Sequence, residues 1–263
     1  MADFSTLRID TAARGVATIT MDRPEVRNAF DDRLISEMYQ AAGAVADDPD
    51  VRVVVLTGAG SIFSAGADLN WMRSMKEWTF EENVADSTRM NTMFRALYDL
   101  PKPLIGRING HALGGGTGLT AVCDIAISVE TALFGFTEVV LGLAPAVISP
   151  YVVRKVGRSF ARAVFVTGER FDAARALAAG LLHQVVFAEA LDEAVEAAVA
   201  RCLKAGPVAA AAAKRLPDLA LQPLDDATAE TVQVIAGLRV GAEGQEGMAA
   251  FFDKRAASWV PGD

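Results

Sequence analysis

The sequence predicts an α/β protein, and three observations lead to that prediction. The segment 51–57 (VRVVVLT) is a nearly continuous run of β-branched residues, which is typical of a strand buried on both faces. The segment 31–46, directly before it, carries apolar residues at helical spacing. The same succession of strand, turn and helix returns after Pro103. Strands that alternate with helices in this way build a sheet covered by helices.

Composition and charge limit the classes of function. The chain has 263 residues, of which 52% are hydrophobic and 22% charged, enough apolar material for one sizeable core. Acidic residues exceed basic ones by 33 − 25 = 8, and no run of Lys or Arg is present, so a nucleic-acid partner is not expected. Cys123 and Cys202 lie far apart, so we expect neither a disulfide framework nor a metal site.

The expected compartment follows from the cysteines and the absence of targeting signals. Two isolated cysteines fit a reducing environment. The first twenty residues carry charges where a signal peptide needs an apolar stretch. The longest uncharged apolar run, 139–153, is too short for a bilayer and contains prolines. We therefore expect a cytoplasmic protein with no membrane partner.

The first half of the chain predicts a hairpin and then alternating elements. Its expected strands are 4–9, 16–21 and 51–57, and its expected helices are 31–46 and 71–99. Arg14 and Gly15 form the turn between the first two strands. Pro101 and Pro103 end the second helix.

The second half changes in composition along its length. Strands are expected at 104–109 and 124–129, on either side of a glycine cluster. Beyond Phe171 alanine dominates, and 191–204 and 207–216 are strong helix formers with no strand between them. This change places a domain boundary near 186–189.

The common catalytic motifs do not match. The stretch after the strand at 51–57 carries Phe63 where a dinucleotide fingerprint needs glycine, and no Walker lysine follows a glycine cluster. His111 and His183 are the only histidines, and neither lies near a nucleophile elbow. His183 is expected to be structural, whereas His111 stays open beside the glycine cluster.

Two segments of small residues are candidates for chemistry: 63–69 (FSAGADL) and 110–119 (GHALGGGTGL). Small side chains allow a ligand to approach the backbone closely. If Gly115 begins a helix, its unpaired amides favour an oxyanion, and the Ala67 amide completes a two-donor hole. The alternative for either segment alone is tight packing between strand and helix.

In their order along the chain these segments resemble the crotonase family, the enoyl-CoA hydratase/isomerase superfamily. The similarity covers nearly the whole chain, through 23–29 (RPEVRNA), 64–69, 109–124, 134–143, 177–181 and 246–255. The resemblance implies a β-β-α spiral core over 1–187 with the coenzyme A (CoA) site and active site. It also implies a helical region over 188–263 that forms a trimer or a dimer of trimers.

The resemblance further implies an acyl-CoA thioester as substrate, with no tightly bound cofactor and no metal. The amides of Ala67 and Gly115 would hold its carbonyl oxygen, and Glu138 matches the glutamate that exchanges a proton with substrate carbon. Apolar neighbours should raise the pKa of Glu138 toward neutrality. Hydratases of this family usually carry a second glutamate where this chain has Gly118. We therefore expect open room beside Gly118.

Other contacts to CoA are implied residue by residue. Backbone groups at Ala29, Ala65, Asp68, Leu69 and Asn70 would meet the CoA moiety. Arg27 would reach a phosphate, and Lys254 would supply charge from its own or a neighbouring subunit. For both cations the alternative is an ordinary solvated charge.

The type of reaction is narrowed by a second resemblance. The segments 116–126 and 141–151 are similar to bacterial methylglutaconyl-CoA and isohexenylglutaconyl-CoA hydratase-like proteins. This favours a hydratase acting on a branched or unsaturated acyl-CoA. One alternative is an enoyl-CoA isomerase that uses the same single glutamate. Another, from a different class, is a non-catalytic acyl-CoA-binding member of the fold.

Overall fold

The computed structural model describes residues 4–12 and 14–262, and a six-stranded sheet lies at its centre. The strand order is β1-β2-β3-β4-β6-β9, with β1 antiparallel to β2 and all other neighbours parallel. The strands of this sheet are β1 (Leu7–Ala12), β2 (Val16–Met21), β3 (Val53–Gly58), β4 (Leu104–Ile108), β6 (Ile125–Val129) and β9 (Gln184–Val186). The predicted hairpin is confirmed, although its first strand begins at Leu7 rather than at Phe4.

A second, smaller sheet stands beside the glycine cluster. It joins β5 (Ala112–Leu113) to β7 (Leu133–Gly135) in parallel, and β7 to β8 (Arg170–Asp172) antiparallel. Short 3-10 helices connect the larger elements: η1 (Pro24–Val26), η2 (Met75–Glu77), η3 (Thr137–Leu141) and η4 (Ala188–Ala190).

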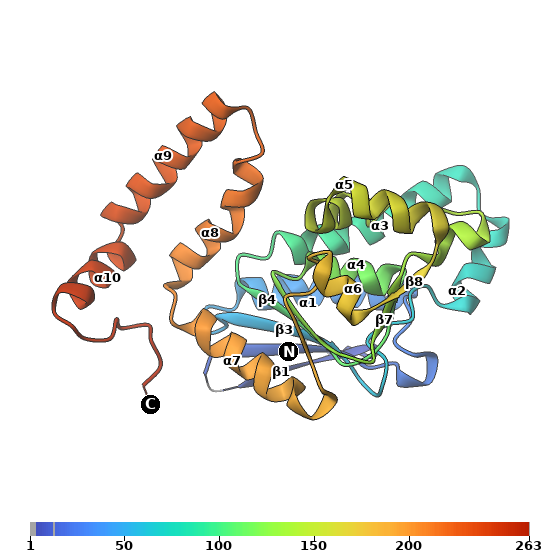
Figure 1. The fold of residues 1–263 in the computed structure, drawn as a ribbon, viewed down its shortest axis with the longest axis horizontal. Coiled ribbons are helices and arrows are strands. Elements are labelled where there is room, and N and C mark those ends of the chain that lie inside the picture. The colour runs from blue at the N-terminus through green and yellow to red at the C-terminus, as the bar shows by residue number, and fades with distance from the viewer. Residues whose placement is uncertain (1–3, 13, 263) are drawn as a thin grey trace.

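Helices cover both faces of the large sheet (Figure 1). One face carries α1 (Asp32–Asp47), α3 (Phe80–Tyr98), α4 (Gly115–Val122), α5 (Ser149–Thr167) and α6 (Ala173–Ala178). The other face carries α7 (Leu191–Leu203). This arrangement confirms the predicted α/β class. None of the helices in the described part of the chain is long and apolar enough to cross a membrane.

Helix α1 illustrates how the sequence specifies its own packing. Asp31 caps its start, because the carboxylate accepts a hydrogen bond from the backbone N–H of Leu34 at 2.8 Å. The apolar positions predicted from periodicity are all buried: Leu34, Ile35, Met38, Ala41, Ala42 and Val45. The helix thereby packs one apolar face on the sheet.

The single helix predicted over 71–99 is wrong in its continuity. The chain instead forms α2 (Leu69–Ser74), then η2, and then α3. The break falls at Trp78 and Thr79, where Thr79 and Glu82 form a reciprocal capping box that starts α3. The cap is local, so the interruption needs neither glycine nor proline.

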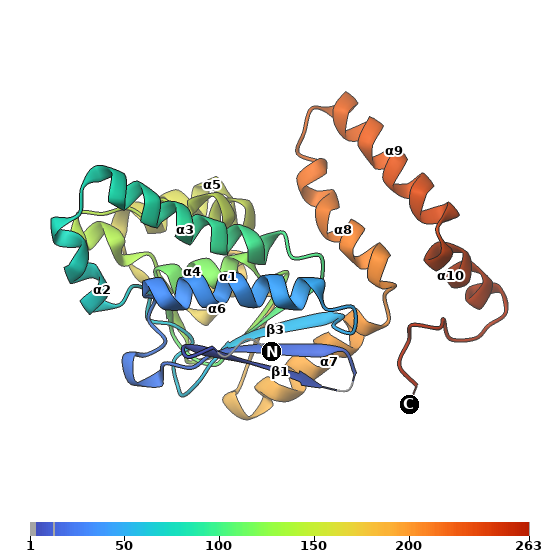
Figure 2. The same cartoon turned by 180° about the vertical axis from the view of Figure 1, so that it is seen from behind.

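The C-terminal helices separate into a core part and an arm. Six side chains of α7 belong to the hydrophobic core: Leu191, Ala194, Val195, Ala198, Val199 and Leu203. Helix α7 therefore packs with the sheet. The following helices α8 (Pro207–Leu219), α9 (Leu224–Val240) and α10 (Ala242–Phe252) extend away from the sheet (Figures 1 and 2).

Polar contacts tie the base of this arm to the core. Lys214 of α8 forms an ion pair with Asp124 at 2.8 Å. The hydroxyl of Tyr98 donates a hydrogen bond to Asp218 at 2.6 Å. Arg52 donates to the carbonyl of Ala205 at 2.7 Å and also to that of Trp259 near the C-terminus. The arm is thus anchored at its first helix and along its returning tail.

Candidate active site

The two segments of small residues lie side by side. Ser64 and Ala112 form a parallel bridge, and the N–H of Leu113 donates to the carbonyl of Ser64 at 3.0 Å. The approach is closest at Gly66, where φ is 89° and a Cβ would lie 2.9 Å from the Leu113 carbonyl oxygen. Only glycine fits there. The structure therefore joins the segments that the sequence singled out separately.

The backbone amides of Ala67 and Gly115 are left without internal acceptors. Ala67 bridges Phe30, and the bonds of that bridge come from its neighbours: Phe30 N–H to the Gly66 carbonyl at 2.7 Å, and Asp68 N–H to the Phe30 carbonyl at 2.8 Å. Gly115 opens α4, whose first N–H groups have no partner within the helix. Among the described residues neither amide donates a hydrogen bond to the protein.

The Glu138 carboxyl group lies against the same glycine cluster. Its Oε1 is 3.2 Å from the point where a Cβ on Gly114 would stand. Its Oε2 is buried and has no hydrogen-bond partner among the described residues. Burial raises the pKa of Glu138 above its usual range, and the hydrogen bond from its own backbone N–H opposes this only in part.

Aromatic packing and a tight turn fix the segment that carries Glu138. Phe136 packs edge-on against Phe165 with ring centroids 4.8 Å apart, and it also contacts Phe171. After η3, Gly142 adopts a left-handed conformation, and the N–H of Leu143 donates to the Glu138 carbonyl at 3.0 Å. The backbone that carries Glu138 is therefore fixed by Phe136 before it and by the turn at Gly142 after it.

This arrangement has the parts needed for chemistry beside a carbonyl group. Two adjacent N–H donors can hold an oxygen on which negative charge develops, and such donors stabilise the transition state more than the substrate. A half-buried carboxyl group whose pKa is raised by burial is suited to take up and return a proton. Together they suit reactions that pass through an enolate.

The expected room beside Gly118 is absent, and this expectation is corrected. A Cβ on Gly118 would lie 2.5 Å from Cγ2 of Ile148 and 3.1 Å from Cε1 of Phe94. Both side chains are buried in the hydrophobic core. The space that a second carboxylate would need is filled by apolar atoms.

The residues predicted to contact CoA fall into two groups. Arg27, Ala29, Ala65, Asp68, Leu69 and Asn70 belong to two chain segments that run together, because the N–H of Ala65 donates to the Arg27 carbonyl at 3.0 Å. Leu69, Asn70 and Arg27 are exposed, whereas Ala29 and Asp68 are buried. Lys254 follows α10 in the arm, at the opposite end of the molecule from α2 (Figure 1).

Both histidines serve the fold. Nδ1 of His183 accepts a hydrogen bond from the N–H of Ala126 at 2.9 Å, as its predicted structural role requires. Nδ1 of His111 accepts from the N–H of Leu133 at 3.0 Å, which settles the open case. Each ring thus joins two chain segments through a backbone amide.

Sequence reasoning missed Arg23, which forms ion pairs with Asp31 and with Asp68 beside Ala67. Its position in the motif RPEVRNA was visible, but its partner Asp68 lies 45 residues away. No local periodicity indicates such a pair.

Comparison with known proteins gives a consistent result. The family model described as Enoyl-CoA hydratase/isomerase matches residues 11–261. A Thermus thermophilus relative is 36% identical over 243 residues, covering 91% of this chain and 95% of that protein. An Escherichia coli relative named 2,3-dehydroadipyl-CoA hydratase is 32% identical, and the match covers 91% of this chain and 93% of that protein.

A solved structure agrees with the sequence comparison. The crystal structure of an enoyl-CoA hydratase from Shewanella pealeana superposes with a TM-score of 0.92 at 39% identity, covering 97% of this chain and 96% of that one. Fold, sequence and order of motifs agree along almost the full length. The chain therefore belongs to the enoyl-CoA hydratase/isomerase family, a family of enzymes.

Proposed function

We propose that the protein is a hydratase that adds water to an enoyl-CoA thioester, or removes it, with Glu138 as its only catalytic carboxylate. One observation carries the proposal: the Glu138 carboxyl group, whose Oε2 is buried without a partner among the described residues, places its Oε1 against the glycine cluster that also presents the unpaired Gly115 amide. An unpaired buried polar atom is costly, and an enzyme retains one where it serves the reaction.

In the proposed reaction the two amides hold the thioester oxygen and Glu138 transfers the protons. The water oxygen bonds to the β-carbon of the enoyl group, and the double-bond electrons move toward the thioester oxygen, which the amides of Ala67 and Gly115 hold. Glu138 accepts a proton from the water and returns one to the α-carbon. The raised pKa of Glu138 brings both transfers closer to balance near neutral pH.

The packing at Gly118 supports an isomerase as the second candidate. An isomerase moves one proton between two carbons, for which a single carboxylate is sufficient. Ile148 and Phe94 fill the position of a second carboxylate, so no charged group stands at that position to hold water. A non-catalytic acyl-CoA-binding protein would have no need for the buried carboxyl group of Glu138, so this third reading is disfavoured.

For the acyl group we propose a branched or unsaturated chain. The E. coli relative is named for a dehydroadipyl thioester, whose acyl chain ends in a second carboxylate. A carboxylate on the substrate can help Glu138 to position the water. CoA enters the reaction as part of the substrate and not as a bound cofactor.

We further propose that residues 188–263 support self-association into a trimer or a dimer of trimers. The arm exposes large apolar side chains, including Leu224 at 81%, Val240 at 80% and Phe251 at 79% of their full area. Apolar surface of this extent is typical of a face that another subunit covers. A neighbouring arm would also bring Lys254 to the CoA phosphates. The two unpaired cysteines fit a cytoplasmic location.

The test is direct. Purified protein is incubated with 2-enoyl-CoA, 3-enoyl-CoA and glutaconyl-CoA esters, and products are identified by mass spectrometry. We expect a water adduct from at least one 2-enoyl or glutaconyl ester, and its loss in Glu138→Gln with binding retained, because that variant keeps the shape and loses the transferable proton. Shifted double bonds without any water adduct would replace the hydratase by the isomerase. Unchanged turnover in Glu138→Gln would place the proton carrier elsewhere.

A further inference from the structure

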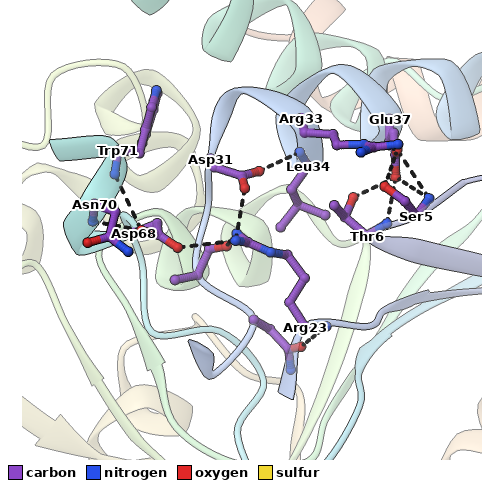
Figure 3. A network of polar contacts seen from close by, with 12 residues as sticks. Ser5, Thr6, Arg23, Asp31, Arg33, Leu34, Glu37, Asp68, Asn70 and Trp71 are labelled. Carbon is purple, nitrogen blue, oxygen red and sulfur yellow. Dashed lines mark hydrogen bonds and ion pairs between the residues drawn. The ribbon is translucent and has the colours of Figure 1, made fainter. Parts of the chain in front are cut away.

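Arg23 stands at the centre of an ion cluster next to the site (Figure 3). One nitrogen of its guanidinium lies 2.9 Å from Asp31 and 3.2 Å from Asp68. The other terminal nitrogen donates to the carbonyl of Ala29 at 2.6 Å. The Arg23 side chain is only 16% exposed, so solvent screens these charges weakly.

Both carboxylates also start a helix. Asp31 accepts a hydrogen bond from the N–H of Leu34 at the beginning of α1. Asp68 accepts from the N–H of Asn70 at 2.8 Å and of Trp71 at 3.3 Å at the beginning of α2. A single guanidinium therefore links the N-terminal turns of two helices that are far apart in the sequence.

The contacts of Arg23 with Ala29, Asp31 and Asp68 surround the backbone bridge that contains the Ala67 amide. Phe30 and Ala67 are partners in a parallel bridge. Arg23 contacts the residues before and after Phe30, which are Ala29 and Asp31, and it contacts Asp68 directly after Ala67. The direction of the Ala67 N–H is set by this short stretch of backbone. The Arg23 side chain ties the segment 29–31 to Asp68, directly after Ala67.

We propose that Arg23 is a positioning residue that aims the Ala67 N–H at the thioester oxygen, a role that rests on the proposed function. The strength of a hydrogen bond falls steeply as donor and acceptor lose alignment. Donors to a developing oxyanion act only when they are fixed before the reaction. Arg23 also offsets carboxylate charge beside a position where negative charge must form.

Glu37, on the helix α1 that Asp31 caps, provides a control for Arg23 (Figure 3). Its carboxylate accepts hydrogen bonds from the N–H of Thr6 at 2.8 Å and from the N–H of Ser5, and it pairs with Arg33. These bonds join α1 to the two residues directly before β1 and involve neither Ala67 nor Asp68. Loss of this network should weaken the fold without changing the direction of the Ala67 amide.

The first measurement reads the amide directly. Butanoyl-CoA labelled with 13C at its thioester carbonyl is bound to the protein, and its carbonyl stretch is recorded by isotope-edited infrared spectroscopy. We expect a lower frequency than in water for the wild type and for Glu37→Gln. Arg23→Gln should return the band toward its position in water, and Arg23→Lys should lie between the two.

The second measurement separates binding from turnover. With the substrate found in the panel, Arg23→Gln should lower kcat about ten- to hundredfold, less than the loss of a whole donor, and leave KM within about threefold. Glu37→Gln should retain kcat below its unfolding temperature. Arg23→Lys should recover part of kcat.

The outcomes distinguish the two proposals. If the wild type binds no thioester, or binds it with no shift of the carbonyl band, the oxyanion hole and with it the proposed function fail. If the wild type shows the shift and Arg23→Gln keeps both the shift and kcat, the role of Arg23 is refuted and the function stands. Equal losses of kcat in Arg23→Gln and Glu37→Gln would also refute a positioning role, because a merely structural residue gives that result.

Discussion

Gly118→Ala tests the packing of Ile148 and Phe94 against Gly118 of α4. The added Cβ would lie 2.5 Å from Cγ2 and 3.0 Å from Cβ of Ile148, so a branched, buried side chain must move. Overpacking of a core costs about 1–3 kcal/mol. Replacing glycine in a helix by alanine returns about 0.5–1 kcal/mol. We expect Gly118→Ala to lower the free energy of unfolding by about 2 kcal/mol, near the upper end of the overpacking cost minus the helix gain, because the clash with Ile148 is close.

A double-variant cycle with Ile148→Ala identifies the cause. Ile148→Ala alone should cost about 2–5 kcal/mol through the cavity it leaves. In the double variant the new methyl group occupies part of that cavity, so the combined loss should be smaller than the sum of the single losses. Urea denaturation at fixed protein concentration measures all four free energies. Strict additivity, or a Gly118→Ala variant as stable as the wild type, would refute the packing argument.

Three further predictions concern charge and assembly. Burial raises the pKa of Glu37, but the hydrogen bonds donated by Thr6, Arg33 and Ser5 together outweigh burial and lower it to about 2. The contribution of Glu37 to stability should therefore be present above about pH 4.5 and disappear as the pH falls toward 2. Glu37→Gln should cost about 1.5–3 kcal/mol at pH 7 and flatten this acid dependence in thermal unfolding; an unchanged acid limb would contradict the assignment. Because burial raises the pKa of Glu138, its effect on stability runs in the opposite direction: stability should fall as the pH rises above about 4.5. Glu138→Gln should therefore unfold at a higher temperature than the wild type at pH 7. A lower unfolding temperature for that variant would show that burial of the Glu138 carboxylate does not cost stability. Leu224→Asp with Phe251→Asp should dissociate the proposed oligomer in sedimentation velocity, and a wild type that is monomeric at micromolar concentration would contradict self-association.

The sequence was most informative where structure depends on neighbours in the chain. The β-branched run at 51–57 and the spacing of Leu34, Met38 and Val45 predicted β3 and α1, because burial selects residues with the period of the element. The break before α3 also leaves a signal in the local sequence. Thr79 and Glu82 form a capping box, but the surrounding helical pattern concealed it.

The sequence was least informative where two distant segments compete for one space. The room expected beside Gly118 is filled by Ile148, which approaches from a loop 30 residues further along the chain. The Arg23–Asp68 pair has the same long-range character. The alanine-rich composition of 191–204 predicted a helix there, but not that Leu191, Val199 and Leu203 of α7 pack in the core. Composition alone does not tell which surface a helix face meets.

The central claim is that the Ala67 and Gly115 amides and the Glu138 carboxyl group act together on one thioester. A crystal structure of the protein with a saturated acyl-CoA thioester tests it most directly. We expect the thioester oxygen to lie about 3 Å from the backbone nitrogens of both Ala67 and Gly115, with the Glu138 carboxyl group beside the α- and β-carbons. A thioester oxygen that contacts neither amide, or an acyl chain that lies away from Glu138, would contradict the account.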